Sequence, residues 1–399
     1  MPRVNTFAKL ATVGEAIDIL LGSITPIARK YTVDLDYADN RILAADVVAP
    51  RDDPHYDQCF MDGYAVIAAD TAGSSAASPK FLRLAEGDTV TPGTCRQVHT
   101  GSALPYGADA VVRLEEMDAA RGGINVLQEA KAGQYFTPQG DVIKKGDVVF
   151  LEGRQLKPTD IAMLATLGLN AVEVYEKPRV LVIPTGDEVV ERGKVAGPGE
   201  VNESNGLMCY LFVRRFGGKA SVWDLVPDDV EKLKEALRTG LDYDLIVTSG
   251  GTSVGKRDHM HELVESMGKV LVHGVGLKPG RPMGLGYIEE VGRRVPIVFL
   301  PGFPDACAVG AMTFVSRAVE KLGHYPRRRY PGIEAEMLDG VTTFRGTVAV
   351  RKVVVDQGKA RPVDTVGPSP YAGEYAYAVI PEDGKAIEKG DPACLRMLE

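Results

Sequence analysis

Glycines, hydroxyl side chains and acids directly follow two apolar runs of the sequence. The run 180–184 leads into Thr185, Gly186, Asp187 and Glu188. The run 245–248 leads into a longer polar stretch that contains Ser249, Gly250, Gly251, Thr252, Ser253, Gly255 and Asp258. Glycine backbone N–H groups can surround an anion, and hydroxyls can donate further hydrogen bonds to it. These two stretches therefore predict a site for a phosphate-bearing ligand.

Two further motifs add positive charge and tight turns. Lys278 and Arg281 occur in KPGRP, after an apolar segment that ends at Val272, and Pro301 and Pro304 occur in PGFP after the run 296–300. Lys and Arg side chains suit phosphate oxygens. Each motif alone has a simpler interpretation, because Gly and Pro after a strand often only form a turn. Four such motifs on one sheet edge favour a ligand site.

Two carboxylates in these stretches predict a metal ion. Glu188 and Asp258 would lie at neighbouring strand ends, next to the expected phosphate. Mg²⁺ is bound by few carboxylates together with substrate phosphate oxygens. The residues thus indicate a phosphate-bearing ligand with a divalent metal, and they leave the reaction open.

The segment that carries these motifs alternates strand-like and helical patterns between residues 179 and 322. Such alternation predicts a parallel sheet with crossover helices, and ligands bind at the carboxyl ends of the strands in such sheets. The flanking segments differ. Residues 13–30 and 158–167 have helical spacing of apolar residues, whereas residues 32–150 and those after 326 read as short strands between Gly, Pro and Asp clusters. The expected fold class is multidomain α/β plus β, with a central three-layer α/β domain, a mostly parallel sheet and flanking β-rich domains.

Composition narrows the class of protein. The chain has 399 residues, a net charge of −8, 45% hydrophobic and 25% charged residues, and no apolar stretch long enough to span a membrane. The acidic balance disfavours nucleic acid as a partner, and the run 327–329 of three arginines is interpreted as a solvated surface segment. The first residues lack a signal-peptide core, which predicts a cytoplasmic protein. Five widely spaced cysteines predict reduced thiols and no zinc site.

The motifs together resemble those of a known family. SGGTSVG followed by Asp258, PTGDE, KPGRP, LPGFP, MDGYAV at 61–66, and Thr100 with Gly101 occur in the order found in the MoeA and gephyrin E-domain family, the molybdopterin molybdenumtransferases. The resemblance runs almost from end to end. It implies a homodimer of four domains, which here would be residues 1–45 with 141–177, residues 46–140, residues 178–326 and residues 327–399.

The resemblance also implies a reaction and partners. Family members take adenylylated molybdopterin and molybdate, or tungstate, cleave the adenylate with a magnesium-type ion, release AMP and leave the metal on the dithiolene. A molybdopterin adenylyltransferase is a further candidate partner. Two alternatives stay open: a divergent paralogue that binds molybdopterin or another oxyanion without insertion, and a non-catalytic dimeric scaffold.

Residue roles follow from the resemblance where the motifs match. Asp62 of MDGYAV corresponds to an acid that reaches the active site of the partner subunit, although Asp62 with Gly63 could simply form a turn. Glu188 and Asp258 resemble the metal-side carboxylates, and these two with Asp62 are the expected catalytic residues. The expected substrate-binding residues are Thr100, Thr185, Gly186, Asp228, Ser249, Gly250, Gly251, Thr252, Ser253, Gly255, Lys278, Arg281, Pro301 and Pro304.

Several of these residues have structural alternatives. Asp228 matches a family acid, and it also precedes the helical segment 229–238 as a candidate N-cap. Asn205 is expected to cap its own helix, and Asp187 to cap the segment that follows it. His99, His259, His261 and His273 show no ligand spacing and are interpreted as structural or exposed.

The sequence also departs from the family pattern. The family commonly has LPGNPVS where this chain has LPGFPDA, so Phe303 and Ala306 replace an amide and a hydroxyl, and an acid, Asp305, appears between them. A basic run before GEDI is replaced by FTPQ at 136–139, and the motif itself reads GDVI, with Asp141 and Val142. A lost donor to a charged group costs on the order of 1.5–3 kcal/mol. Weaker binding of a tetraoxo anion is therefore expected.

Overall fold

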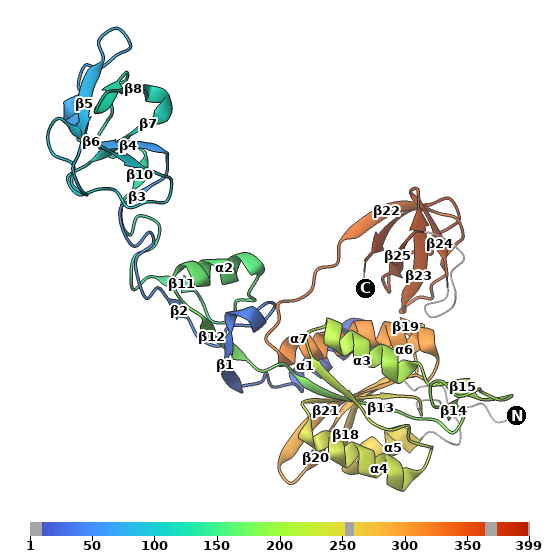
Figure 1. The fold of residues 1–399 in the computed structure, drawn as a ribbon. Helices are drawn as coiled ribbons and strands as arrows, with labels where there is room; N and C mark the ends of the chain where they lie inside the picture. The colour runs from blue at the N-terminus through green and yellow to red at the C-terminus, as the bar shows by residue number, and fades with distance from the viewer. Residues whose placement is uncertain (1–9, 252–258, 364–372, 398–399) are drawn as a thin grey trace, which may run out of the picture. The chain divides into compact units, whose positions relative to one another are not determined.

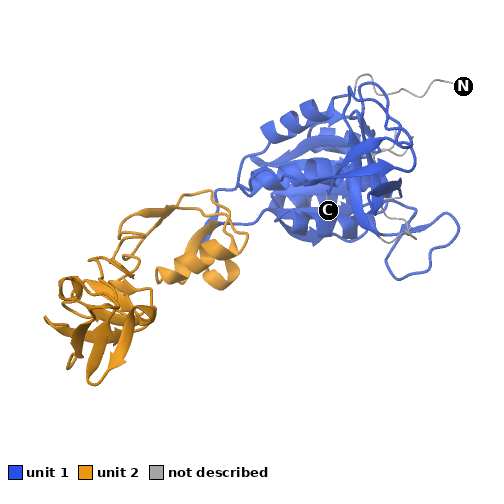
Figure 2. Cartoon of the chain, turned by 90° about the horizontal axis from the view of Figure 1, so that it is seen from above, with its two compact units in different colours: residues 1–31, 175–399 blue, residues 32–174 orange. Residues whose placement is uncertain are grey.

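The computed structural model describes residues 10–251, 259–363 and 373–397, which pack as two compact units (Figure 2). The first unit contains residues 1–31 and 175–399, and the second contains residues 32–174. Each unit is described by itself. The division into four domains stays a prediction.

The first unit is built on a six-stranded sheet (Figure 1). Its order is β16 (Lys219–Val222), β13 (Arg179–Pro184), β17 (Leu245–Ser249), β21 (Arg293–Leu300), β20 (Gly284–Glu290) and β18 (Gly268–His273). The first four strands are parallel, and β20 and β18 complete the sheet by antiparallel pairing. The sheet is mostly parallel, as the alternating sequence pattern predicts.

Alternate residues of the central strands enter two separate cores. Val180 and Val182 pack on one face of the sheet with the helices α1, α3, α6 and α7, whereas Leu181 and Ile183 pack on the other face with α4 and α5 (Figure 1). A strand buried on both faces has a continuous apolar sequence, which explains the run 180–184. The result is the expected three-layer arrangement, and the structure confirms the fold class.

Some helices of the first unit have clear start signals, α1 above all. They are α1 (Val13–Gly22), α3 (Asn205–Arg215), α4 (Val230–Thr239), α5 (His259–Met267), α6 (Pro304–Gly310), a π-helical segment (Ala311–Val315) and α7 (Ser316–Leu322). Thr12 and Glu15 form a reciprocal capping box at the start of α1, with hydrogen bonds of 3.1 and 2.9 Å. The expected helix 13–30 is too long, because α1 ends at Gly22 and Pro26 follows soon after.

The C-terminal part of the first unit is a small barrel, as the β-rich texture after residue 326 predicts. Strands β23 (Val348–Asp356), β24 (Lys359–Pro362), β22 (Gly332–Met337), β26 (Pro392–Arg396) and β25 (Glu374–Ile380) pair in this order, and β25 pairs back to β23. β19 (Leu277–Lys278) adds to β23 in parallel. The segment before β19 thus joins the barrel to the central sheet along the backbone.

The second unit is mainly β-structure with one helix. Its largest sheet has the order β7 (Ala110–Arg113), β4 (Gly63–Val66), β6 (Thr94–Val98), β5 (Lys80–Leu84), β9 (Gly123–Val126) and β8 (Met117–Ala120). Three two-stranded ladders pair β3 (Gln58–Cys59) with β10 (Phe136–Thr137), β2 (Val47–Val48) with β11 (Val148–Phe150), and β1 (Lys30–Asp34) with β12 (Ala171–Tyr175). The helix α2 (Pro158–Thr166) packs beside β12 in a core that contains Leu164 and Val174.

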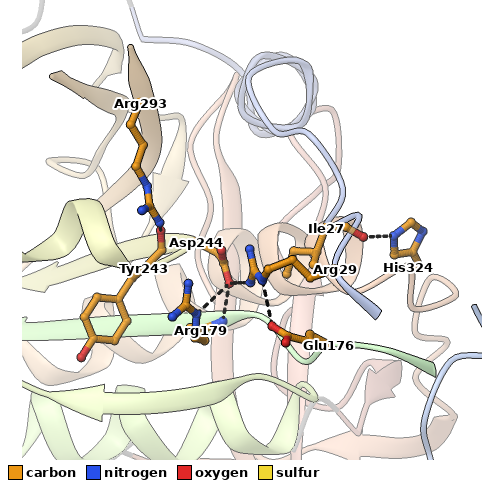
Figure 3. A network of polar contacts seen from close by, with 8 residues as sticks. All are labelled: Ile27, Arg29, Glu176, Arg179, Tyr243, Asp244, Arg293 and His324. Carbon is orange, nitrogen blue, oxygen red and sulfur yellow. Dashed lines mark hydrogen bonds and ion pairs between the residues drawn. The ribbon is translucent and has the colours of Figure 1, made fainter. Parts of the chain in front are cut away.

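A largely buried acid connects the two points at which the chain leaves and re-enters the first unit to the start of two central strands. Asp244 precedes β17 and accepts hydrogen bonds from Arg29 Nη2 at 2.7 Å and from the Arg179 backbone N–H at 2.8 Å (Figure 3). Arg29 also donates to Glu176 Oε2 at 2.8 Å. Arg29 and Glu176 lie where the chain leaves and re-enters this unit, so both passages are held next to the start of the central strand β17.

The run 327–329 is only partly a solvated segment. Arg327 and Arg329 are exposed, but the Arg328 guanidinium lies 5.3 Å from the centre of the Phe216 ring and donates to the Arg215 carbonyl. The stem of an arginine can cover apolar surface while its charged end stays solvated. Within the described ranges, no helix has the length and apolar character needed to cross a membrane.

Candidate active site

Three strand ends that the sequence singles out lie side by side. Pro184 of β13 is in register with Ser249 of β17, and Ser249 is in register with Leu300 of β21. Beyond these pairs the loops stay joined, because the Thr185 N–H donates to the Ser249 carbonyl at 2.9 Å and the Gly250 N–H donates to the Leu300 carbonyl at 3.0 Å. The three loops therefore leave the sheet at one edge.

Close backbone packing at this edge requires glycine. Gly250 has a φ of +107°, and a Cβ atom there would lie 2.3 Å from the Thr185 carbonyl oxygen. A Cβ atom on Gly302 would lie 3.6 Å from Gly250 Cα, so the loops after β17 and β21 nearly touch. A side chain at Gly250 would separate the loops, and glycine thus brings the three backbones together.

Thr185 and Ser249 are expected to offer their hydroxyls to a ligand, but both residues are buried. Thr185 and Ser249 are both 3% exposed, and Thr185 Oγ1 donates to the Ser249 carbonyl at 3.3 Å. Thr185 therefore holds the loops together, and its hydroxyl is not presented at the surface. The predicted residues Thr252, Ser253, Gly255 and Asp258 lie outside the described residues.

The acids after β13 and β16 separate into two roles. Glu188 is exposed, whereas Asp187 Oδ1 accepts the Asp228 backbone N–H at 3.0 Å. Asp187 thereby joins its own loop to the one that follows β16. Asp228 is not the N-cap of α4. That position is taken by Asp229, which accepts the Lys232 N–H at 3.0 Å. The capping interpretation of Asp228 is wrong by one residue.

Contrary to the expectation from the sequence, Asn205 does not cap α3. It is the first residue of α3, Ser204 takes the N-cap position, and the Asn205 side chain donates from Nδ2 to the Gly302 carbonyl at 2.8 Å. The expected capping role is wrong, because this amide joins the start of α3 to the loop after β21. The α3 N-terminus is instead satisfied by Glu203, which accepts the Gly206 N–H through Oε1 at 2.5 Å.

The basic motif follows the end of β18, the edge strand of the central sheet, after a short connecting segment. β18 ends at His273, and Lys278 belongs to β19, which pairs with the barrel. Lys278 Nζ donates to Thr342 Oγ1 at 3.2 Å and lies 4.4 Å from the centre of the Phe344 ring. Arg281 is exposed. β18 and β21 both pair antiparallel with β20, so β18 ends at the same edge as β21. The KPGRP motif therefore follows a fourth strand end at this edge, and Lys278 itself lies further along the chain, against the barrel.

The loop after β21 borders a cavity of about 360 Å³ between the central sheet and the barrel, within the first unit. Phe303 lines this cavity and is 66% exposed, whereas Pro301 and Ala306 are buried and Pro304 begins α6. Asp305 is 5% exposed and lies on the cavity wall with its Oδ2 3.5 Å from Arg351 Nη1.

Arg351 is a candidate site residue that the sequence analysis missed. It lies on β23 and lines the same cavity as Lys278. The available signal was an arginine inside the apolar run VAVRKVVV, since a charge within a strand often marks one face of a sheet. Nothing in the sequence indicated that this strand would face the loop after β21.

Asp62 and Thr100, which the sequence singles out separately, form one structure in the second unit. Asp62 Oδ1 accepts the Thr100 backbone N–H at 2.7 Å and the Thr100 hydroxyl at 3.1 Å. These donors, the backbone N–H first, hold the pKa of Asp62 below its ordinary value. Asp62 therefore joins its own turn to the Thr100 turn, and its role in catalysis stays a prediction.

The described residues offer few carboxylates to a metal ion. No group of three or more His, Cys, Asp or Glu side chains in the described ranges is arranged to hold one. Exposed Glu188, in the loop after β13, still fits Mg²⁺, which needs only one or two carboxylates when substrate phosphate supplies other oxygens.

Comparison with known proteins gives the family. Residues 11–168 match the model of the MoeA N-terminal region (domain I and II), and residues 181–321 match a probable molybdopterin binding domain. The chain is 32% identical to molybdopterin molybdenumtransferase 2 of Mycobacterium tuberculosis, covering 85% of this chain and 86% of that protein. It is also 32% identical to the molybdopterin molybdenumtransferase of Haemophilus influenzae, with 74% of each chain covered.

A solved structure extends the likeness to the whole fold. The molybdopterin biosynthesis MoeA protein from Pyrococcus horikoshii OT3 matches with a TM-score of 0.80 and 29% identity, over 97% of this chain and 100% of that one. The fold is that of a transferase of molybdenum cofactor biosynthesis. The chain belongs to the molybdopterin molybdenumtransferase (MoeA) family.

Proposed function

We propose that this protein inserts molybdate, or tungstate, into adenylylated molybdopterin with release of AMP. The observation that carries the proposal is the meeting of three glycine-containing loops at one edge, beside a cavity lined by Lys278 and Arg351. Backbone N–H groups and cationic side chains are the groups that bind phosphate and oxyanions. Membership of the family supports the choice of reaction.

Different residues of this chain have different roles in the proposed site. The loops after β17 and β21 bind and orient the phosphate part of the substrate, and Lys278 with Arg351 supplies positive charge for the oxyanion. Glu188, together with Asp258, would hold Mg²⁺. When bound, that ion neutralises phosphate charge and stabilises the leaving AMP.

The proposal includes a homodimer in the cytoplasm. Asp62 and Thr100 belong to the second unit, whereas the strand-end loops belong to the first. A site completed by the Asp62 carboxylate of a second copy agrees with the role that the family motif implies. A molybdopterin adenylyltransferase is the proposed donor of the substrate.

The decisive experiment is incubation of the purified protein with adenylylated molybdopterin, Mg²⁺ and molybdate, followed by chromatography of AMP and of the metal-bound pterin. We expect AMP release that depends on all three components. The Glu188→Gln protein should release AMP more slowly and need more Mg²⁺. Tight binding of the adenylylated pterin without AMP release would show a binding protein and contradict the proposal.

A further inference from the structure

The cavity beside the loop after β21 contains both signs of charge. Its wall includes Lys278, Phe303, Asp305, Asp339, Thr342 and Arg351. A cavity that binds only oxyanions is expected to be lined by cations without acids, because a carboxylate close to a bound anion repels it. The two acids therefore call for an explanation.

The two acids are placed differently. Asp305 lies in the first turn of α6, its side chain is 7% exposed, and its Oδ2 is 3.5 Å from Nη1 of Arg351 on the barrel strand β23. Asp339 is 51% exposed and pairs with Arg361, with 3.0 Å between Oδ2 and Nη1. Of these two acids, only Asp305 thus contacts a cation of the cavity wall, and its carboxylate is buried while the Arg351 side chain is 38% exposed.

A buried carboxylate beside Arg351 affects any incoming anion in two ways. It is tethered to the protein and therefore competes for the guanidinium at a high effective concentration. It also repels a dianion, and this repulsion is poorly screened because the carboxylate is buried. In the proposed site an adenylylated substrate would also contact the loops after β17 and β21, so the same acid should affect its binding much less than that of a free dianion.

We infer that Asp305 is a specificity-determining residue that lowers the affinity of the site for free tetraoxo dianions by occupying Arg351. The inference rests on the proposed function, since it deepens the account of the oxyanion part of that site. Asp305 stands where the family pattern LPGNPVS has an uncharged residue, so the effect belongs to this chain.

The test is a calorimetric titration of molybdate into the wild-type protein and the Asp305→Asn, Asp339→Asn and Arg351→Gln variants, with sulfate as a second probe. We expect Asp305→Asn to bind molybdate about tenfold more tightly. Asp339→Asn, which removes an acid of the same cavity that pairs elsewhere, should change affinity by less than about twofold. Arg351→Gln should weaken binding, and adding Asp305→Asn to it should recover little.

The alternative role for Asp305 is to hold Arg351 in place. In that case Asp305→Asn would weaken molybdate binding, which overturns the inference, as would an unchanged affinity. Asp305→Val is the second variant if the Asn protein does not fold. Molybdate binding is measured without pterin, so the inference and the proposed function can fail separately. If the wild-type protein releases AMP but Asp305→Asn binds molybdate no more tightly, only the inference is wrong. If Asp305→Asn binds molybdate more tightly but the wild-type protein releases no AMP, only the proposed function is wrong.

Discussion

At the scale of single residues, two hydrogen-bond donors lower the pKa of Asp62. The Thr100 backbone N–H and hydroxyl both donate to one carboxylate oxygen, and they lower the pKa of this exposed acid. Its folded-state pKa lies below the unfolded value, so the linked stability is present above the unfolded pKa and is lost as pH falls through the folded pKa. Acidification therefore weakens the Asp62–Thr100 contact once the pH falls low enough to protonate Asp62.

We predict that Thr100→Val raises the pKa of Asp62 part of the way to its ordinary value, because the hydroxyl is lost while the backbone donor, the larger cause, remains. Carboxyl-carbon NMR titration measures this pKa. Asp52 is the internal control, since its lowered pKa depends first on the Lys145 backbone N–H and then on Gln139. An Asp62 pKa that stays as low as in the wild type would mean that the hydroxyl contributes nothing.

At the scale of elements, the ends of the parallel strands depend on the absence of one side chain. Gly250→Ala would place a Cβ atom 2.3 Å from the Thr185 carbonyl oxygen at a φ of +107°. We expect the free energy of unfolding to fall by about 2 kcal/mol or more. Urea denaturation followed by fluorescence of the single tryptophan, Trp223, reports the central sheet directly, because Trp223 packs against its core.

Gly292→Ala is the matched control for this prediction. Gly292 also has a positive φ, +74°, but an added Cβ atom would contact nothing within 4 Å. Only the cost of the left-handed conformation remains, about 1 kcal/mol. If the two variants lose equal stability, the clash with the Thr185 carbonyl is relieved by movement of the loops and the close packing described here is not rigid.

The start of α4 gives a second prediction for an element. Asp229 accepts the Lys232 N–H, and Asp228 does not cap the helix. Asp229→Ala should therefore lower the free energy of unfolding by about 1 kcal/mol. Asp228→Ala should cost less stability and act on AMP release instead. Urea denaturation followed by Trp223 fluorescence measures the stability of both variants. A larger stability loss in Asp228→Ala than in Asp229→Ala would mean that Asp228 caps the helix.

At the scale of the whole molecule, the proposed site needs residues from both units. Asp62 lies in the second unit and Glu188 in the first. If two chains share each site, an Asp62→Ala chain and a Glu188→Ala chain can together rebuild one intact site per mixed dimer. Random reassociation of the two inactive proteins should then restore about a quarter of wild-type AMP release.

Two differently tagged Asp62→Ala chains serve as the control for this mixing experiment, and they should stay inactive. Copurification of both tags proves that mixed dimers have formed. Mixed Asp62→Ala and Glu188→Ala dimers without AMP release would show that each site is built within one chain.

The sequence by itself determined the parts of the molecule that depend on local order along the chain. Apolar runs such as 180–184 and 245–248 define buried strands, and the polar residues after them must meet because parallel strands end at a common edge. Gly186, Gly250 and Gly251 could be placed there without coordinates. MDGYAV and the Thr100 turn could also be singled out, but only through resemblance.

The tertiary structure alone decided which distant side chains meet. Lys278 faces the barrel because β19 pairs with β23, Asn205 reaches the Gly302 carbonyl, and Asp305 lies against Arg351. Each of these contacts joins elements that are far apart in the sequence, and a side chain's partner across such a gap depends on how whole layers pack. Periodicity reports which face of an element is buried, and it carries no information about what that face will meet.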